Sequence, residues 1–304
     1  MSALPTDAEA GERISSASPP AVRSGGRRFP ERALALLLLA PALALLAALF
    51  LYPLLLSLVS AFTDREGGVG LDNFRKVFEL YSRDVVFTGI VAVAVVLICD
   101  VLAIAIGGYL ILGRNPTAVA ILRWLYRWPL FIPFVVAAQM MRSFLAKNGL
   151  MNNSLVAMGV LEPASTIGLL DWRGMVITFV WKQLPFVTLI VAGAMASLDR
   201  SMIEAARNLG ASRTRALIEI VVPQIRGPLV VASVLTFVTL LSVLSVPMMI
   251  NAGSPNMITV DMAYRITSLS DYGAANALGV VSYLMTACVA WLYLRQGVGR
   301  RLDA

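Results

Sequence analysis

Few residues of this chain have the types and spacing that catalysis or metal binding requires. The 304 residues include no histidine, which is the commonest metal ligand and a frequent general base. Cys99 and Cys288 lie in separate apolar stretches, which argues against a disulfide framework. The sequence also lacks the G-x-x-x-x-G-K-[S/T] loop that cradles nucleotide phosphates. We therefore predict a non-catalytic protein with no metal or cofactor of its own.

Polar residues inside apolar stretches are the remaining candidates for chemistry. Ionisable groups are costly in lipid and usually face a cavity or a partner. Asp100, Lys182, Gln183 and Asn251 are the candidates for lining a solute path. Counted from the outer ends of their segments, Asp100 and Lys182 differ in depth by roughly 10 Å. An ion pair would need Lys182 to reach inward. The alternative is that Lys182 extends to the outer interface and Asp100 hydrogen-bonds to a neighbouring helix.

The composition shows what kind of elements must position these residues. Apolar residues make up 58% of the chain and charged residues 14%, and the mean hydropathy is +0.78. Soluble domains contain about 45–50% apolar and about 25% charged residues. The net charge of +7 does not indicate nucleic-acid binding, because long apolar runs separate the basic residues. We predict an all-α integral membrane protein.

Six segments are long and apolar enough to cross a bilayer core about 30 Å thick. They are residues 33–62, 85–112, 124–146, 174–197, 228–250 and 273–294. Pro129 and Pro133 interrupt the third segment, so a re-entrant segment, with five spans in total, is the alternative. Residues 1–29 have no apolar period and predict a disordered cytoplasmic tail. A second short tail is expected at 298–304.

The basic residues predict the orientation of these spans. With the N-terminus inside, sixteen basic residues fall in inner segments and eight in outer ones, as the positive-inside rule requires. Five spans would place Arg300 and Arg301 outside. Six spans with both termini in the cytoplasm therefore agree better with the charge distribution.

The longest inner connection, residues 198–227, has helical character although it is too polar to span a membrane. Ser201 to Leu209 are all compatible with a helix, and Gly210 supplies a stop with an expected positive φ. Ile203, Ala206 and Leu209 are expected on one face. A solvated loop and a docking element for a partner are both compatible with this pattern.

This loop resembles the EAA loop of ATP-binding-cassette importer permeases, whose pattern is E-A-A, three residues, G, nine residues, I, one residue, L-P. Val222 replaces the usual leucine. The resemblance extends over about residues 30–297, the expected membrane domain. The residues that match the pattern, together with the alanine after the glycine, are Glu204, Ala205, Ala206, Gly210, Ala211, Ile220 and Pro223.

The resemblance implies a type I importer permease fold in a bacterial or archaeal cell membrane. Two permease subunits, homologous or identical, would enclose the path. Each would insert its EAA helix, Glu204 to Ala206, into one of two cytoplasmic ATPase subunits, which bind ATP and Mg. An extracytoplasmic binding protein would deliver the solute. Gly210 would form the turn after the docking helix, and Pro223 would redirect the chain toward the fifth span.

Subfamily features suggest the solute class. Sugar permeases usually carry Asp-Gly-Ala after the E-A-A triplet, whereas this chain has Leu-Gly-Ala-Ser at 209–212. That version, with residues 128–138, 149–155 and 259–264, resembles permeases for polyamines, opines, iron and aminoalkylphosphonates. We therefore expect a polyamine-like or other small polar solute, and outer Asp261 and Asp271 would suit a cation. A sugar is the alternative. A secondary transporter or a membrane enzyme is the alternative from a different class.

Overall fold

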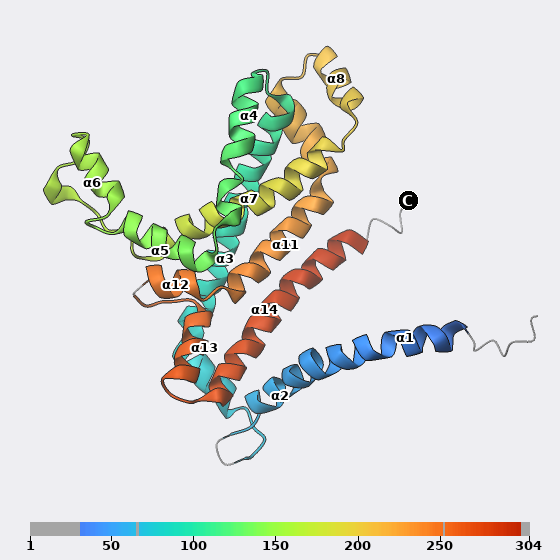
Figure 1. Ribbon diagram of the computed structural model, residues 1–304, viewed down its shortest axis with the longest axis vertical. Coiled ribbons are helices and arrows are strands. Elements are labelled where there is room, and N and C mark those ends of the chain that lie inside the picture. The colour runs from blue at the N-terminus through green and yellow to red at the C-terminus, as the bar shows by residue number, and fades with distance from the viewer. Residues whose placement is uncertain (1–30, 65–66, 252, 299–304) are drawn as a thin grey trace, which may run out of the picture. The chain divides into compact units, whose positions relative to one another are not determined.

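The computed structural model describes residues 31–64, 67–251 and 253–298, and these residues are almost entirely helical (Figure 1). The described residues form one isolated β-bridge, between Thr63 and Val69. This confirms the all-α prediction. The chain divides into two units, Met1–Pro53 and Leu54–Ala304. The predicted tail 1–29 and all of the predicted tail 298–304 except its first residue lie outside the described residues.

The first unit contains α1 (Glu31–Leu46) and the short π-helix η1 (Ala47–Leu51), and α2 (Tyr52–Ala61) begins within it. Residues Leu38–Ala61 are long and apolar enough to cross a membrane, and none of their most apolar stretch is buried in the protein. A helix that exposes apolar side chains on all sides suits contact with lipid or with another subunit. The predicted first span, 33–62, agrees with this segment.

The core of the second unit is the packing of α3 (Asp72–Leu112) against α7 (Trp172–Ala196). Val95, Cys99 and Phe179 are fully buried there. Helices α11 (Arg226–Ser242) and α14 (Tyr272–Val298) complete the bundle by packing on α3 and on each other. The predicted second span began at residue 85, but its helix begins thirteen residues earlier, because the polar stretch from Asp72 is helical too.

Two of the predicted spans are broken. In place of one helix over 124–146 the chain forms α4 (Pro116–Leu125), the 3₁₀ turn η2 (Trp128–Phe131) and α5 (Phe134–Leu145), followed by α6 (Leu150–Ala157) and the turn η3 (Pro163–Ser165). The two halves meet at 108°. Pro133 is responsible, because the residue before a proline avoids the helical region and Ile132 has ψ 122. A bent span and a re-entrant segment both agree with this geometry.

The predicted span 228–250 also breaks, at Val243 and Leu244, and α12 (Ser245–Ile250) follows α11. The described residues contain four helices that could cross a membrane unaided, or up to six spans if each bent pair counts as one. The first, fourth and sixth predicted spans coincide with continuous helices.

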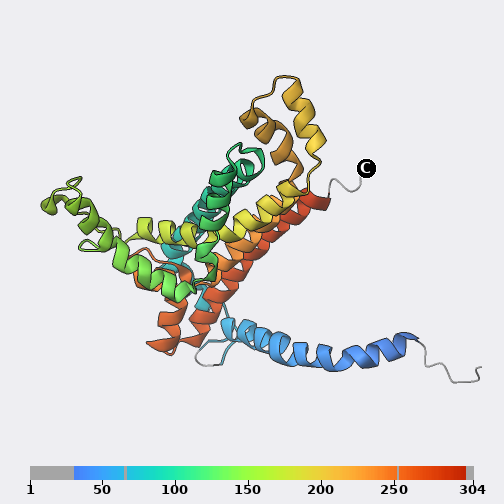
Figure 2. The same ribbon diagram turned by 45° about the horizontal axis from the view of Figure 1, so that its top comes forward.

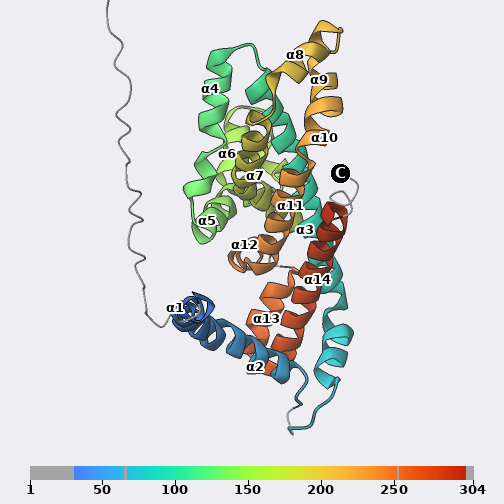
Figure 3. The same cartoon turned by 90° about the vertical axis from the view of Figure 1, so that its right-hand side faces the viewer.

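The second unit has two distinct ends. The start of α3 lies beside α13 (Ile258–Thr267) at one end, whereas α4 and α8 (Arg200–Asn208) lie together at the other (Figures 1, 2 and 3). At the α13 end, Asp271 accepts from Lys76 Nζ and from Arg265 Nη1, each at 3.1 Å, and Arg265 Nε donates to Tyr81 at 2.7 Å. Burial alone would raise the pKa of Asp271, but the hydrogen bonds from Lys76 and Ala274 and the two positive charges hold it below its usual range.

We predict that Asp271→Asn strongly destabilises the protein. The Arg265 side chain is only 10% exposed, so removing its carboxylate leaves a buried charge uncompensated, which costs about 3–5 kcal/mol. Glu79→Gln is the matched control: it removes one carboxylate from the exposed Arg75–Glu79 pair, which is worth about 0–1 kcal/mol. Size-exclusion chromatography after heating in detergent measures both. Equal melting temperatures for the two variants would contradict the stabilising role of the buried Arg265–Asp271 ion pair.

Candidate functional site

The loop between α7 and α11 begins with α8, which contains the E-A-A triplet. Asp199 precedes the helix with extended backbone, and its carboxylate accepts from the Ser201 N–H at 2.9 Å. A side-chain oxygen at this position satisfies one of the free N–H groups of the first turn. The helix runs over Arg200–Asn208, one residue offset from the predicted 201–209.

Gly210 closes the helix as predicted. Its φ is +90°, a conformation that only glycine adopts without strain. The N–H of Gly210 donates to Arg207 O and the N–H of Ala211 donates to Ala206 O, both at 3.0 Å. This pair of bonds is a Schellman motif, which satisfies the last carbonyls of the helix. The backbone of the E-A-A segment is therefore held at both ends.

The second half of the loop fixes α8 to the membrane domain. Ser212 caps the short α9 (Arg213–Ala216), which continues into η4 (Leu217–Val221) and α10 (Val222–Gln224). The chain then bends by 75° into α11. Ala216, Val221 and Ile225 are fully buried. The predicted residues Ile220 and Pro223 are half-buried beside them, so they lie where the loop turns and not on its exposed surface.

The faces of α8 differ from the expected ones. Ile203 is buried and Ala206 is half-buried, but Leu209 is 90% exposed. Leu209 fails to join them because successive steps of three residues drift around a helix of 3.6 residues per turn. It instead continues an outward face with Met202 and Ala205, which are also exposed. The spacing i, i+3, i+7 of these three residues was the sequence signal for this face.

Glu204 is exposed on a different side of α8 from Leu209. Within the described residues its carboxylate makes no hydrogen bond or ion pair. The helix thus presents an apolar face and a separate negative charge, both open to a partner.

The four predicted path residues are not brought together. Asp100 lies on α3 and accepts from Ser233 Oγ of α11 at 2.7 Å. Cys99 Sγ lies 3.9 Å from Val180 O on α7. Asp100 and Lys182 follow these two residues by one and two positions, so they lie at similar levels of the bundle and not roughly 10 Å apart as predicted. The prediction failed because it counted depth from the start of each segment, and α3 and α7 do not start at the same level. No ion pair forms, since the Asp100 carboxylate is directed to α11.

Lys182 does not extend to the outer interface either. It is 6% exposed, with Nζ 3.4 Å from Leu130 O and 4.9 Å from the centre of the Phe134 ring. The lysine thus packs against the break between α4 and α5. The sequence gives no signal for this contact, because its partners are distant along the chain. Gln183, next to it, is buried, and its amide nitrogen has no acceptor among the described residues.

Asn251 and Asp271 have structural partners, and Asp261 differs from them. Asn251 Nδ2 donates to Pro255 O at 2.9 Å, and Asn256 Nδ2 donates back to Asn251 O. Asp261, on α13, is half-buried, and burial together with the nearby Asp84 raises its pKa to about 7. Asp271 is held by Lys76 and Arg265. Of the two outer carboxylates, Asp271 is therefore paired, whereas Asp261 Oδ2 is buried without a hydrogen-bond partner among the described residues.

These features define a membrane permease component, and comparison with known proteins identifies its family. Residues 101–297 match the family described as binding-protein-dependent transport system inner membrane component. The chain belongs to this family, whose members are the permease subunits of ATP-binding-cassette importers. It is accordingly a non-catalytic transport subunit, and the alternatives of a membrane enzyme and a secondary transporter are excluded.

Three relatives illustrate the range of solutes. A sulfoquinovosyl glycerol permease of Agrobacterium fabrum is 28% identical, over 87% of this chain and 90% of its own length. A trehalose/maltose permease of Thermococcus litoralis is 27% identical, over 77% and 81%. A spermidine/putrescine permease of Haemophilus influenzae is 22% identical, over 81% and 87%. These relatives favour the sugar alternative over the predicted polyamine-like solute.

The fold agrees with the family. A bacterial ABC transporter that imports the acidic polysaccharide alginate contains a chain with a TM-score of 0.72 and 20% identity, covering 87% of this chain and 96% of that one. This similarity supports the expected type I importer architecture of the membrane domain.

We predict that Gly210→Val loosens the end of α8. A side chain at φ +90° costs about 1–2 kcal/mol, although nothing lies within 4 Å of the position. Hydrogen exchange of the Ala211 amide should accelerate about 5- to 30-fold. Gly227→Val is the control, because Gly227 also faces open space but lies within α11 and outside the left-handed region. Equal acceleration in both variants would contradict the role of the cap.

Proposed function

We propose that this chain forms half of the translocation path of a carbohydrate importer and receives the work of ATP hydrolysis through α8. The observation that carries the proposal is the outward apolar face of Met202, Ala205 and Leu209 on a helix fixed at both ends. A short amphipathic helix with exposed residues at this spacing is suited to lie in a groove of a partner.

The local structure suits transmission of force. Ala205 has little bulk, so a partner backbone can approach α8 closely, and Glu204 offers a charge for orientation. Ile203 and the buried residues of the following loop tie α8 to the membrane helices. A closing motion of the ATPase would therefore move α7 and α11 together with α8. Such coupling requires that nucleotide and loaded binding protein each favour one of two arrangements of the permease.

Within the proposed complex, two ATPase subunits that bind ATP and Mg occupy the α8 end, which is cytoplasmic. A second permease subunit completes the path in the inner membrane. A binding protein delivers the solute at the α13 end. The positive-inside distribution of the basic residues supports this orientation.

A sugar is supported as the solute by the relatives with sugar names, and the ion pairs of Asp271 remove one of the carboxylates that suggested a cation. The cation hypothesis relied on Asp100, Asp261 and Asp271. Asp271 is neutralised by two basic side chains. Asp100 accepts from a serine hydroxyl through Oδ2, but Asp100 Oδ1 and Asp261 Oδ2 are buried without a hydrogen-bond partner among the described residues. A neutral or acidic glycoside needs no free carboxylate. We retain as proposed path residues the four polar positions that would become exposed to the path when the helices move: Asp100, Lys182, Gln183 and Asn251.

The test of the solute class is uptake by cells that express the complete importer with its own ATPase, second permease and binding protein. We expect transport of labelled trehalose or sulfoquinovosyl glycerol, each inhibited by an excess of the unlabelled compound and not by spermidine. Transport of labelled spermidine with no transport of either glycoside would contradict the carbohydrate assignment.

In the same assay Leu209→Asp should lower uptake at least about tenfold, because a docked leucine side chain contributes about 1.5–3 kcal/mol. Asn208→Asp is the control, since it adds the same charge at an exposed neighbouring position outside the apolar face. Both variants should reach the membrane in normal amounts. Unchanged uptake in Leu209→Asp, with the ATPase still bound, would contradict docking through α8.

A further inference from the structure

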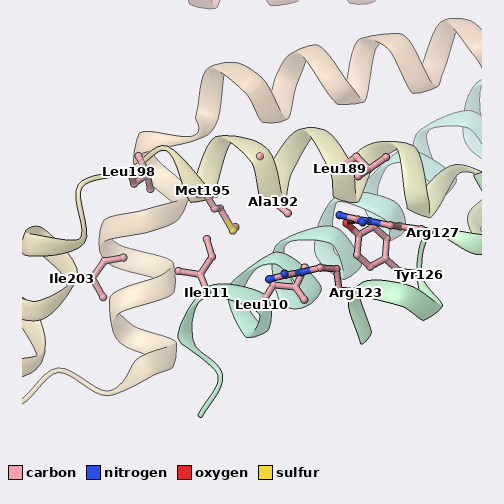
Figure 4. A pocket seen from close by; sticks show the side chains of 12 residues that line it. Leu110, Ile111, Arg123, Tyr126, Arg127, Leu189, Ala192, Met195, Leu198 and Ile203 are labelled. Atoms are coloured by element: carbon pink, nitrogen blue, oxygen red, sulfur yellow. Dashed lines mark hydrogen bonds between the residues drawn. The ribbon is translucent and has the colours of Figure 1, made fainter. Parts of the chain in front are cut away.

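A cavity of about 330 Å³ lies beside the proposed docking helix. The ends of α3, α4 and α7 line it, together with Ile203 of α8. Figure 4 shows Arg123 and Arg127 toward one end of the cavity, Ile203 at the other, and Met195 of α7 between them. The cavity therefore extends from the basic side chains of Arg123 on α4 and Arg127 just after it to the segment that we propose as the site of coupling.

The two arginines of this cavity are exposed and lack a carboxylate partner among the described residues. Arg127 Nε lies 3.3 Å from the Tyr126 hydroxyl, and its guanidinium lies 5.6 Å from the Tyr126 ring centre. Among the described residues no carboxylate pairs with Arg123 or Arg127, and no acidic residue lines the cavity. Guanidinium groups that lack a carboxylate are well suited to bind a phosphate.

The same two arginines border a second, apolar space. An open groove of about 790 Å³ runs from Arg123 and Arg127 along Trp124, Trp128 and Phe131. These three aromatic side chains are 61%, 57% and 83% exposed. Exposed tryptophans are typical of the boundary between headgroups and acyl chains. A positive cavity and an apolar groove that share two arginines fit a molecule with an anionic head and a long apolar tail.

We propose that Arg123 and Arg127 bind the phosphate of an anionic phospholipid such as phosphatidylglycerol, whose acyl chain lies in the groove along Trp124, Trp128 and Phe131. Basic pockets between membrane helices on the cytoplasmic side are suited to anionic headgroups. The placement of the pocket in the inner leaflet rests on the orientation in the proposed function. An acyl chain would fill the apolar groove, whereas free phosphate has no apolar part to place there. The groove therefore favours a lipid over free phosphate as the ligand.

A headgroup that fills the cavity would extend from the two arginines to α8 at the other end (Figure 4). Leu198 and Ile203, which line the cavity, bracket the start of α8. Occupancy by a lipid therefore favours one position of α8 against α4. We expect the activity of the assembled importer to depend on the anionic lipid content of the membrane.

Native mass spectrometry of the full-length protein, titrated with phosphatidylglycerol or phosphatidylcholine, tests the site. The parent should prefer phosphatidylglycerol. Arg123→Gln/Arg127→Gln should lose about 30-fold of the affinity for it, as expected for two basic side chains near an anionic lipid, and should keep its affinity for phosphatidylcholine. Arg114→Gln is the control, because Arg114 is exposed in the same inner connection and does not line the cavity.

Unchanged phosphatidylglycerol affinity in the double variant, or an equal loss in the control, would overturn the proposal. If the double variant does not fold, the parent still tests it: phosphatidylglycerol brominated on its acyl chains should quench tryptophan fluorescence more than brominated phosphatidylcholine, and equal quenching would overturn it. Displacement of the lipid by excess soluble glycerol phosphate would overturn the lipid assignment in favour of a soluble ligand.

This binding measurement needs neither ATPase nor solute. Failure of the carbohydrate or docking assignment would therefore leave lipid binding intact, whereas failure of the lipid site would leave uptake and its dependence on Leu209 unchanged. The two proposals can be rejected separately.

Discussion

The structure depends on the close approach of α3 and α7. Small residues make it possible: a Cβ placed at Gly107 would lie 2.9 Å from Met195 Sδ, and one at Gly108 would lie 2.6 Å from Leu217 Cδ2. Met195 belongs to the last turn of α7, and Leu217 to the loop that returns from α8. Small residues at helix contacts allow close packing where lipid supplies no hydrophobic driving force. These two contacts, at neighbouring glycines, place the segments before and after α8 against α3.

This arrangement would let a short, polar loop carry out the coupling that we propose. The loop consists of short helical segments, α8, α9, η4 and α10, and the face of α8 formed by Met202, Ala205 and Leu209 is exposed. Its rigidity comes from the Gly210 cap on one side and from Ala216, Val221 and Ile225 packed beneath it on the other. The apolar face of α8 stays free because the helix is held by Ile203 instead.

Features determined by local chemistry were predictable from the sequence. The spans without an internal break, the helix at 200–208 and the positive φ of Gly210 follow from apolar run length and glycine placement. The outward direction of Leu209 was accessible from helix geometry but was assigned to the wrong face. The environment of Lys182 was not accessible, because it depends on the carbonyl of Leu130 and the ring of Phe134 more than 45 residues away.

The solute class likewise depends on tertiary contacts that the local sequence does not reveal. Short motifs such as Leu-Gly-Ala-Ser at 209–212 lie in the loop that we propose to dock on the ATPase and not among the proposed path residues, and so they indicate the solute only by association. The carboxylates gave a physical argument for a cation, and the ion pairs of Asp271 with Lys76 and Arg265 weaken it. Whether a carboxylate is free is a tertiary property that its sequence position does not show.

The most direct test of the central claim, that α8 is the surface on which the ATPase docks, is alkylation of a cysteine at the centre of the α8 face. Ala205→Cys would be made in a chain that carries Cys288→Ala, since Cys288 is exposed and Cys99 is buried. In inverted membrane vesicles a maleimide should modify this cysteine rapidly when the permease is expressed alone, and much more slowly when the ATPase subunit is co-expressed. Equal rates with and without a stably bound ATPase would contradict the account.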